Sequence, residues 1–328
     1  MIHFHATNKF LWTITRFMDA WAPSLKSSIV PVAYDAIPLD RPVPPGVHIF
    51  TDFERLLSPE RSFARRLHRR IAEHPDAYMT LNDPDAWASR FDLLHLLAEG
   101  GINDFRAYRL RDIGPHVQFP AFLRWENDHR GTLGARLQAV EDARERVDRL
   151  VSGSRKLTKH KLMVVEKVNV RDADGLHRKY SAMKIGDHLV PRHLLFSESW
   201  LTKKPDVVTP ELAKEELQFL EEFPHAEQVE HVFRVAGMDY GRIDYGFSNG
   251  RMQVWEINSN PDIVPIPERV DPLRMEGQAW SADLIAQAFR SLLTEPLEGP
   301  AARGFGPGAR LWWGGQARLS RWYDHHRR

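Results

Sequence analysis

Two short segments near the C-terminal end carry the residues best suited to chemistry. Residues 242–247 read RIDYGF and residues 254–258 read VWEIN, with a short polar stretch between them. Asp244, Glu256 and Asn258 supply the carboxylate and amide oxygens that Mg²⁺ prefers, especially where phosphates complete its coordination. The pattern therefore predicts a β-hairpin that holds magnesium. The alternative is a surface hairpin with its acids in water, but Asp and Asn are poor strand formers.

The length of the connecting turn decides whether these oxygens can meet. Because side chains alternate between faces along a strand, a two-residue turn at 249–250 would place Asp244 opposite Trp255 and point the two acids apart. A three-residue loop at 248–250, with a glycine bulge at its end, would put Asp244 and Glu256 on one face as diagonal neighbours. We therefore predict the three-residue loop.

Composition limits the remaining possibilities. The chain has 328 residues, a formal net charge of +1 and no cysteine. The lack of cysteine excludes disulfides, thiolate zinc sites and a cysteine nucleophile. A net charge near zero gives no general argument for binding nucleic acid or membrane. The apolar residues of segment 1–23 are interrupted by polar ones, and no run approaches the ~20 apolar residues of a membrane span, so we expect a cytoplasmic protein without a signal peptide.

The order of patterns predicts an α/β protein in three parts. A small N-terminal α/β lobe covers residues 1–80, the main domain covers 81–300, and a tail rich in Arg, Trp and Gly covers 301–328. Apolar runs and helical periodicity predict the elements within them. Strands are expected at 29–34, 47–50, 77–81, 116–125, 161–170 and 180–189, and helices at 61–73, 84–99, about 137–150, 210–223 and 281–293.

The hairpin pattern, Arg-x-Asp followed by Glu-x-Asn-x-x-Pro, resembles the metal-binding end of the ATP-grasp fold. Upstream segments resemble that fold in the same order. Residues 81–84 and the following helix with Arg90 resemble the opening of its nucleotide-binding region. Residues 119–124 resemble its phosphate-contacting strand, 129–132 its lid loop, and 164–168 the hinge strand beside adenine. Where the family usually has lysine, this chain has Arg90 and Arg124.

The resemblance implies an ATP-grasp architecture with a lid at about 117–165 and a metal-bearing C-terminal lobe. It implies ATP as cofactor with two Mg²⁺ ions on Asp244, Glu256 and Asn258. Arg242 and Arg192 are the implied catalytic residues, with Arg192 facing the acceptor carboxylate or serving structure. The implied nucleotide-binding residues are Arg90, Arg124, Arg130, Glu166, Lys167, Val168, Asp174 and Lys179. Glu166 either accepts from the adenine amino group or is a strand-end residue, and Asp174 either holds ribose or only forms a turn.

The implied activity is that of an ATP-dependent carboxylate–amine ligase that works through an acyl phosphate. Its acceptor would be a small-molecule, peptide or saccharide carboxylate, and a homodimer is compatible with such a fold. The alternatives are a phosphotransferase on the same fold and a non-catalytic nucleotide-binding protein. Nucleic-acid binding by the Arg/Trp tail is a further alternative, although packing of the tryptophans onto the body accounts for them more simply.

Overall fold

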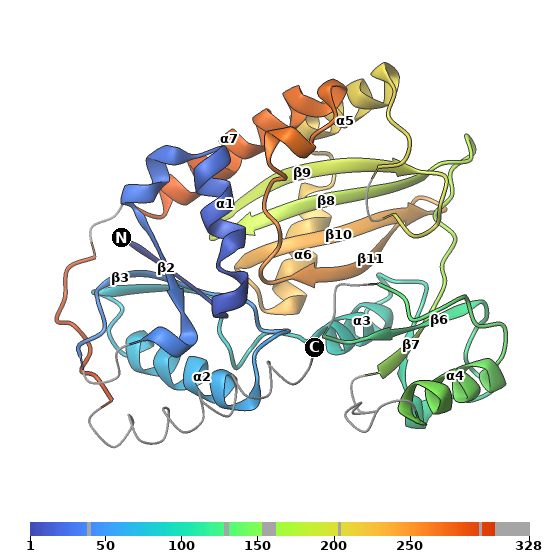
Figure 1. Cartoon of the computed structure of the whole chain (residues 1–328), viewed down its shortest axis with the longest axis horizontal. Helices are drawn as coiled ribbons and strands as arrows, with labels where there is room; N and C mark the ends of the chain where they lie inside the picture. Colours follow the sequence, from blue (N-terminus) through green and yellow to red (C-terminus); the bar gives the residue numbers. More distant parts are fainter. Residues whose placement is uncertain (38–40, 128–130, 153–161, 203–204, 295–296, 306–328) are drawn as a thin grey trace.

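The described residues form three β-sheets, each with helices packed against it (Figure 1). A computed structural model describes residues 1–37, 41–127, 131–152, 162–202, 205–294 and 297–305. Within these ranges, parallel and antiparallel sheets occur together, which agrees with the predicted mixed α/β class. Short 3₁₀ helices lie at Asn8–Phe10, Pro23–Ser27, Tyr34–Ala36, Leu110–Asp112, Pro267–Arg269 and Pro272–Arg274.

The N-terminal sheet is parallel, with strand order β2-β1-β3-β4. Its strands are β1 (Ile2–Ala6), β2 (Ile29–Ala33), β3 (Gly46–Phe50) and β4 (Tyr78–Leu81), with helices α1 (Trp12–Ala20) and α2 (Ser58–Ala72). The predictions for β2, β3, β4 and α2 are confirmed to within a few residues. The sequence analysis did not predict α1, which buries Ile14, Phe17 and Met18 in the core that it shares with α7 (Met275–Ser291).

The central sheet is antiparallel, with strand order β11-β10-β8-β9. Its strands are β8 (His177–Ile185), β9 (His188–Ser197), β10 (Tyr240–Ser248) and β11 (Arg251–Asn258). Helices α5 (Pro210–Glu222) and α6 (Ala226–Ala236) pack on one face, where Tyr180 contacts Phe219 and Ile243 contacts the α6 residues. The single strand predicted at 180–189 is wrong. Gly186 adopts a left-handed backbone (φ 60°), so the chain reverses there into β9.

A third sheet, with order β5-β7-β6, lies at the lower right of Figure 1 beside α4 (Val140–Ser152). Its strands are β5 (Ala107–Arg109), β6 (Ala121–Trp125) and β7 (Leu162–Glu166). Helix α3 (Arg90–Glu99) precedes it and contacts β11. The helix predicted from residue 84 begins only at Arg90, because the Ser89 side chain caps it by accepting from the Asp92 amide.

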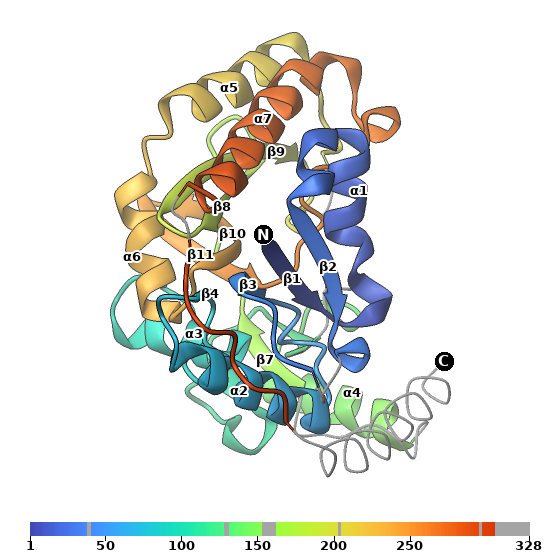
Figure 2. The ribbon, with the colours of Figure 1, turned by 90° about the vertical axis from the view of Figure 1, so that its left-hand side faces the viewer.

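Residues 297–305 lie beside the N-terminal sheet and pass over α2, as the red trace in Figure 2 shows. Phe305 packs on Phe63, and Arg70 donates to the carbonyls of Arg303 and Gly304. The rest of the predicted tail, 306–328, lies outside the described residues. No helix in the described part of the chain has the length and apolar character needed to cross a bilayer.

Candidate active site

The hairpin of β10 and β11 does not have the predicted loop. Ser248 pairs with Arg251, so the turn has two residues, Asn249 and Gly250, with φ of 50° and 77°. Positive φ at both positions is what a type I′ turn requires. The three-residue loop is therefore wrong, because Asn249 accepts the left-handed conformation that the tighter turn needs.

The extra residue lies instead in the middle of β11. Tyr245 pairs with Val254, whereas Asp244 pairs with Glu256, so Trp255 forms a β-bulge between them. A bulge shifts the alternation of side chains by one residue. Asp244 and Glu256 therefore lie directly opposite each other on one face, closer than the diagonal arrangement predicted from the sequence.

A row of polar side chains crosses the sheet at this level. Asp244 pairs with Ser181 on β8, and Ser181 pairs with His193 on β9. A second bulge occurs here, because Ala182 pairs with Pro191 and leaves Arg192 as the extra residue. His193 is buried, and burial lowers its pKa well below the ordinary value, so its ring is neutral at neutral pH.

Asp244 is surrounded by donors. Its carboxylate accepts from Ser181 Oγ at 3.0 Å, Lys179 Nζ at 3.0 Å and Arg242 Nε at 3.2 Å. Burial raises the pKa of Asp244, but the positive charges of Arg242 and Lys179 outweigh burial and hold the pKa below its ordinary value. The Asp244 carboxylate is therefore ionised at neutral pH. The structure thus brings Lys179, Arg242 and Asp244 together, and their roles in binding phosphate and metal stay predictions.

Glu256 has its own pair of cations. Glu256 Oε2 lies 2.5 Å from Arg90 Nη2 and 3.0 Å from Arg124 Nη2. The Arg90 side chain is only 1% exposed and also donates to the carbonyl of Glu126 at 2.7 Å. Since Arg90 begins α3 and Arg124 lies on β6, these contacts join the central sheet to the third sheet through Glu256.

The end of β11 is anchored to the N-terminal sheet. Asn258 Oδ1 accepts from the Asn260 amide at 3.0 Å. Glu54, which follows β3, accepts from both the amide and the hydroxyl of Ser259, at 3.0 and 2.5 Å. Thr13 Oγ1 donates to Asn260 Oδ1 at 2.6 Å. Sequence reasoning missed Glu54, whose only signal is a carboxylate just beyond the carboxyl end of a parallel strand, where ligand sites are common in open sheets.

Glu166 has three donors from the third sheet and its loops. Its carboxylate accepts from the amides of Arg106 (2.8 Å) and Gln118 (2.7 Å) and from the Tyr108 hydroxyl (2.9 Å). Burial raises the pKa of Tyr108 to about 12, so this hydroxyl stays a donor. Glu166 thus holds neighbouring segments together, and a contact with adenine stays a prediction.

The other predicted nucleotide-binding residues lie in different surroundings. Val168 packs in a cluster with Trp255, and Lys167 lies 5.9 Å from the centre of the Trp200 ring. Asp174 lies in the turn before β8, where it forms an ion pair with Arg178 at 2.9 Å. Arg130 lies outside the described residues. The roles of these four residues in nucleotide binding stay predictions.

Arg192 is fully buried and held by polar partners. It donates from Nε to the Ile263 carbonyl at 2.5 Å and from Nη1 to Gln278 Oε1 at 2.8 Å. Burial, with the charge of Arg242 nearby, lowers the pKa of Arg192 to about 9. A guanidinium held in this way positions the segment after β11, and direct contact with an acceptor carboxylate stays a prediction.

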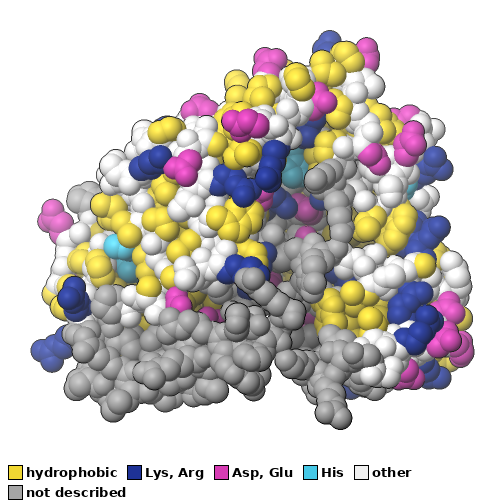
Figure 3. All heavy atoms as spheres, in the orientation of Figure 1, with side chains coloured by type: hydrophobic (Ala, Val, Ile, Leu, Met, Phe, Trp, Pro, Cys, Tyr) yellow, Lys and Arg dark blue, Asp and Glu magenta, His cyan; other side chains and the backbone are white. Residues whose placement is uncertain are grey.

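The site carries more positive than negative charge. Arg90, Arg124, Lys179 and Arg242 bring four positive charges to the two negative charges of Asp244 and Glu256. Figure 3 shows basic and acidic side chains meeting near the middle of this face, over the central sheet. Such an excess suits a polyanion like a triphosphate.

The donor set fits magnesium that arrives with a nucleotide. Among the described residues, no group of three or more His, Asp or Glu side chains could hold a metal alone. Asp244 and Glu256 supply two carboxylates on one face, and Asn258 follows on the same face of β11. Mg²⁺ in nucleotide sites typically takes one or two carboxylates and completes its shell with phosphates and water.

Comparison with solved structures identifies the fold. The arrangement of the sheets and helices matches solved structures of the ATP-grasp fold, so the predicted ATP-grasp fold is confirmed. The D-alanine–D-alanine ligase of Bacillus anthracis matches with a TM-score of 0.50 at 11% identity, covering 89% of this chain and 96% of the ligase. Its complex with ATP also matches with a TM-score of 0.50, at 14% identity, covering 90% and 98%. No protein-family model and no curated protein sequence matches the chain.

Proposed function

We propose that this protein is an ATP-dependent, cytoplasmic ligase that joins a carboxylate to an amine through an acyl phosphate. The observation that carries the proposal is the direct pairing of Asp244 with Glu256, each held by two cations on one face of the sheet. This arrangement provides oxygens for metal ions and cations for phosphates at the same place. The ATP-grasp fold supports the reaction class, because the B. anthracis protein of that fold is a ligase with a structure in complex with ATP.

In the proposed complex, Asp244, Glu256 and Asn258 would hold two Mg²⁺ ions, whose charge would neutralise the triphosphate. Lys179 and Arg242 would then exchange part of their contact with Asp244 for phosphate oxygens. Arg90 and Arg124 would likewise exchange part of their contact with Glu256 for phosphate oxygens, since a guanidinium fork matches phosphate oxygens. Cations fixed in this way stabilise charge that develops on the transferred phosphoryl group.

The proposed reaction has two steps. An oxygen of the acceptor carboxylate forms a bond to the γ-phosphorus while the bond to the β-bridging oxygen breaks, and ADP leaves. The neutral amine then forms a bond to the acyl carbon, the carbon–oxygen bond to phosphate breaks, and the nitrogen loses a proton. Arg242 would stabilise the phosphoryl oxygens or the tetrahedral intermediate, and the position of its guanidinium beside Asp244, at 3.2 Å, supports this role.

The first test is calorimetric titration of the protein with ADP and with a non-hydrolysable ATP analogue, with and without Mg²⁺. We expect Mg²⁺-dependent binding that falls at least about tenfold in an Asp244→Asn/Glu256→Gln variant, because both carboxylates are lost as ligands. Asp187→Asn, at the exposed β8–β9 turn, makes the same chemical change away from the site and serves as the control. Absence of nucleotide binding under every condition would reject the proposal.

The second test identifies the reaction by ADP release across a panel of carboxylates and amines. A ligase releases ADP and phosphate in step with the amide formed and needs both substrates. Accumulation of a phosphorylated acceptor without any amine would instead indicate a phosphotransferase. Full activity in the doubly substituted Asp244→Asn/Glu256→Gln variant would reject the roles assigned to both acids.

A further inference from the structure

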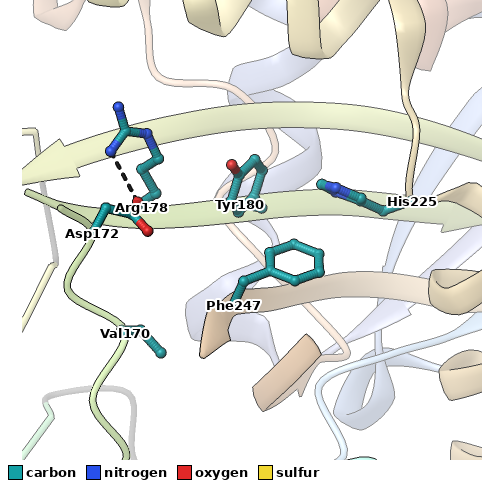
Figure 4. Close-up of a pocket in the computed structure, with 6 residues that line it drawn as sticks. All are labelled: Val170, Asp172, Arg178, Tyr180, His225 and Phe247. Atoms are coloured by element: carbon teal, nitrogen blue, oxygen red, sulfur yellow. Dashed lines mark hydrogen bonds and ion pairs between the residues drawn. The ribbon is translucent and has the colours of Figure 1, made fainter. Parts of the chain in front are cut away.

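A cavity lies on the face of the central sheet opposite to Asp244 and Lys179. Because side chains alternate along β8 and β10, Tyr180 and Phe247 point away from Lys179 and Asp244. Figure 4 shows an ion pair at one end of the cavity and His225 at the other. The cavity measures about 250 Å³ and is lined by Val170, Asp172, Arg178, Tyr180, His225 and Phe247.

The acidic end of the cavity has no free capacity for an anion. Arg178 donates to Glu215 at 2.6 and 3.0 Å, to Asp172 at 2.9 Å and to Asp174 at 2.9 and 3.2 Å. These contacts use all five N–H groups of the guanidinium. Three carboxylates thus surround Arg178, and with Arg171, which donates to the Gly175 carbonyl in the same turn, the local charge is −1. The excess favours a cation.

Apart from Val170, the remainder of the lining is aromatic. Phe247 lies 5.5 Å from the Tyr180 ring and 4.5 Å from the His225 ring, between ring centres. Burial raises the pKa of Tyr180 to about 12 and lowers that of His225, so both are uncharged at neutral pH. The Tyr180 hydroxyl has no hydrogen-bond partner within the described ranges of the chain. Aromatic faces attract cations, and this hydroxyl can bond a polar ligand atom.

We propose that this cavity binds a small organic cation, namely a primary amine with a short apolar arm. The ammonium group would lie beside Asp172, and the arm would pack against Tyr180 and Phe247. The volume admits about ten non-hydrogen atoms, fewer than a drug-sized ligand in a typical pocket. The inference is independent of the proposed ligase activity, because the cavity and the nucleotide site lie on opposite faces of the sheet.

The test uses phenethylamine as the probe, with binding followed by ligand-observed NMR in the absence of nucleotide. We expect a Kd of about 1–10 mM, as is usual for a ligand of this size. The neutral isostere 2-phenylethanol should bind at least about threefold more weakly, since it lacks the charge. Equal binding of the two probes would overturn the assignment to a cation.

Variants locate the site. Asp172→Asn should weaken phenethylamine binding about three- to fivefold, and Tyr180→Phe about twofold or more, because each removes one polar contact. Asp172 is exposed, so its substitution should leave the fold intact. Asp187→Asn, at the other end of β8, is the matched control and should bind like the wild type.

Two outcomes would overturn the assignment of amine binding to this cavity. One is phenethylamine binding that neither Asp172→Asn nor Tyr180→Phe changes, which would locate the amine elsewhere. The other is loss of binding in saturating ADP and Mg²⁺, which would locate the amine in the nucleotide site. If the protein instead failed to bind nucleotide but bound the amine as described, the ligase proposal would fail and this inference would stand.

Discussion

Asp244 and Glu256 face each other directly across two antiparallel strands, although the turn joining those strands would by itself set Asp244 opposite Trp255. The bulge at Trp255 shifts the register that the turn sets by one residue, so that Asp244 pairs with Glu256. The two carboxylates thereby lie at one level, and Arg90, Arg124, Lys179 and Arg242 neutralise them. Without nucleotide, the acids and bases of the site satisfy one another.

This mutual neutralisation predicts that Mg²⁺ binds poorly without nucleotide. A free divalent cation would have to compete with Lys179 and Arg242 for Asp244, and with Arg90 and Arg124 for Glu256. A triphosphate gives those cations new partners and so frees the carboxylates. We expect ADP affinity to rise at least about tenfold with Mg²⁺, and Mg²⁺ affinity to rise by the same factor with ADP. Calorimetry in both orders of addition measures this coupling, and sub-millimolar Mg²⁺ binding to the nucleotide-free protein would contradict it.

Glu256→Gln should lower stability as well as nucleotide binding. The Arg90 side chain is 1% exposed and lies 2.5 Å from Glu256, so the substitution removes a buried counter-charge. Removing one partner of a buried ion pair costs about 3–5 kcal/mol, and the acceptor oxygen retained by Gln reduces this to about 2–3 kcal/mol. Urea unfolding of the nucleotide-free protein measures the free energy of unfolding.

The control for that experiment is Glu145→Gln, which loses an ion pair with Arg149 in which both side chains are 70% exposed. Its loss should cost no more than about 1 kcal/mol. Equal destabilisation by the two substitutions would show that burial of Arg90 does not raise the cost of losing the ion pair with Glu256.

Gly246→Ala should disturb the bulge. A Cβ at Gly246 would lie 2.6 Å from the Trp255 ring and 3.0 Å from the Arg178 carbonyl oxygen, both closer than normal contacts. Overpacking of this kind costs about 1–3 kcal/mol, and we expect that loss in the free energy of unfolding by urea. In a Trp255→Leu background the cost should be smaller, because the indole is absent. A cost that is equal in both backgrounds would assign the clash to the backbone of β8 instead.

Stability should fall at mildly acidic pH because of buried histidines in the N-terminal sheet. His48 Nδ1 lies 2.9 Å from His5 Nε2, and His48 Nε2 lies 3.0 Å from the Pro44 carbonyl. His48 Nε2–H must donate to that carbonyl, so His48 Nδ1 accepts from His5. Burial, with the charge of His3, lowers the pKa of His48 to about 3. A proton on Nδ1 would set two N–H groups against each other.

The direction of this change in stability follows from proton binding in the folded and unfolded states. Below pH 6.5 the unfolded chain protonates His48 and the folded protein does not, so stability declines from there down to about pH 3. Between pH 7.5 and 5 this loss is about 2 kcal/mol for one histidine. We expect His48→Gln to lose about 2 kcal/mol less stability than the wild type between pH 7.5 and 5, as measured by urea unfolding at both pH values. Exposed His188→Gln should match the wild type, and a His48→Gln protein with unchanged pH dependence would refute the assignment.

The sequence alone determined the fold and the chemical character of the hairpin. Carboxylates and an amide at 244, 256 and 258 interrupt apolar strands, and that pattern, with the order of segments before it, indicated an ATP-grasp fold. Local signals also predicted most helices and strands, because hydrophobic periodicity survives in each segment. The turn after β8 was missed, since Gly186 lies within an apolar run and reads as part of one strand.

Only the tertiary structure decided how the site is assembled. Side chains alternate between the two faces of a strand with a period of two. A single bulged residue reverses this alternation, and no local sequence pattern reveals it. The bulged Trp255 packs against a cluster that includes Leu94, Phe105 and Val165, which lie far away in the chain. Likewise, Glu54 reaches Ser259 across 205 positions, and Glu166 accepts from segments up to 60 positions away. Such long-range hydrogen bonds and ion pairs form only when the sheets pack together, so no local pattern can encode their partners.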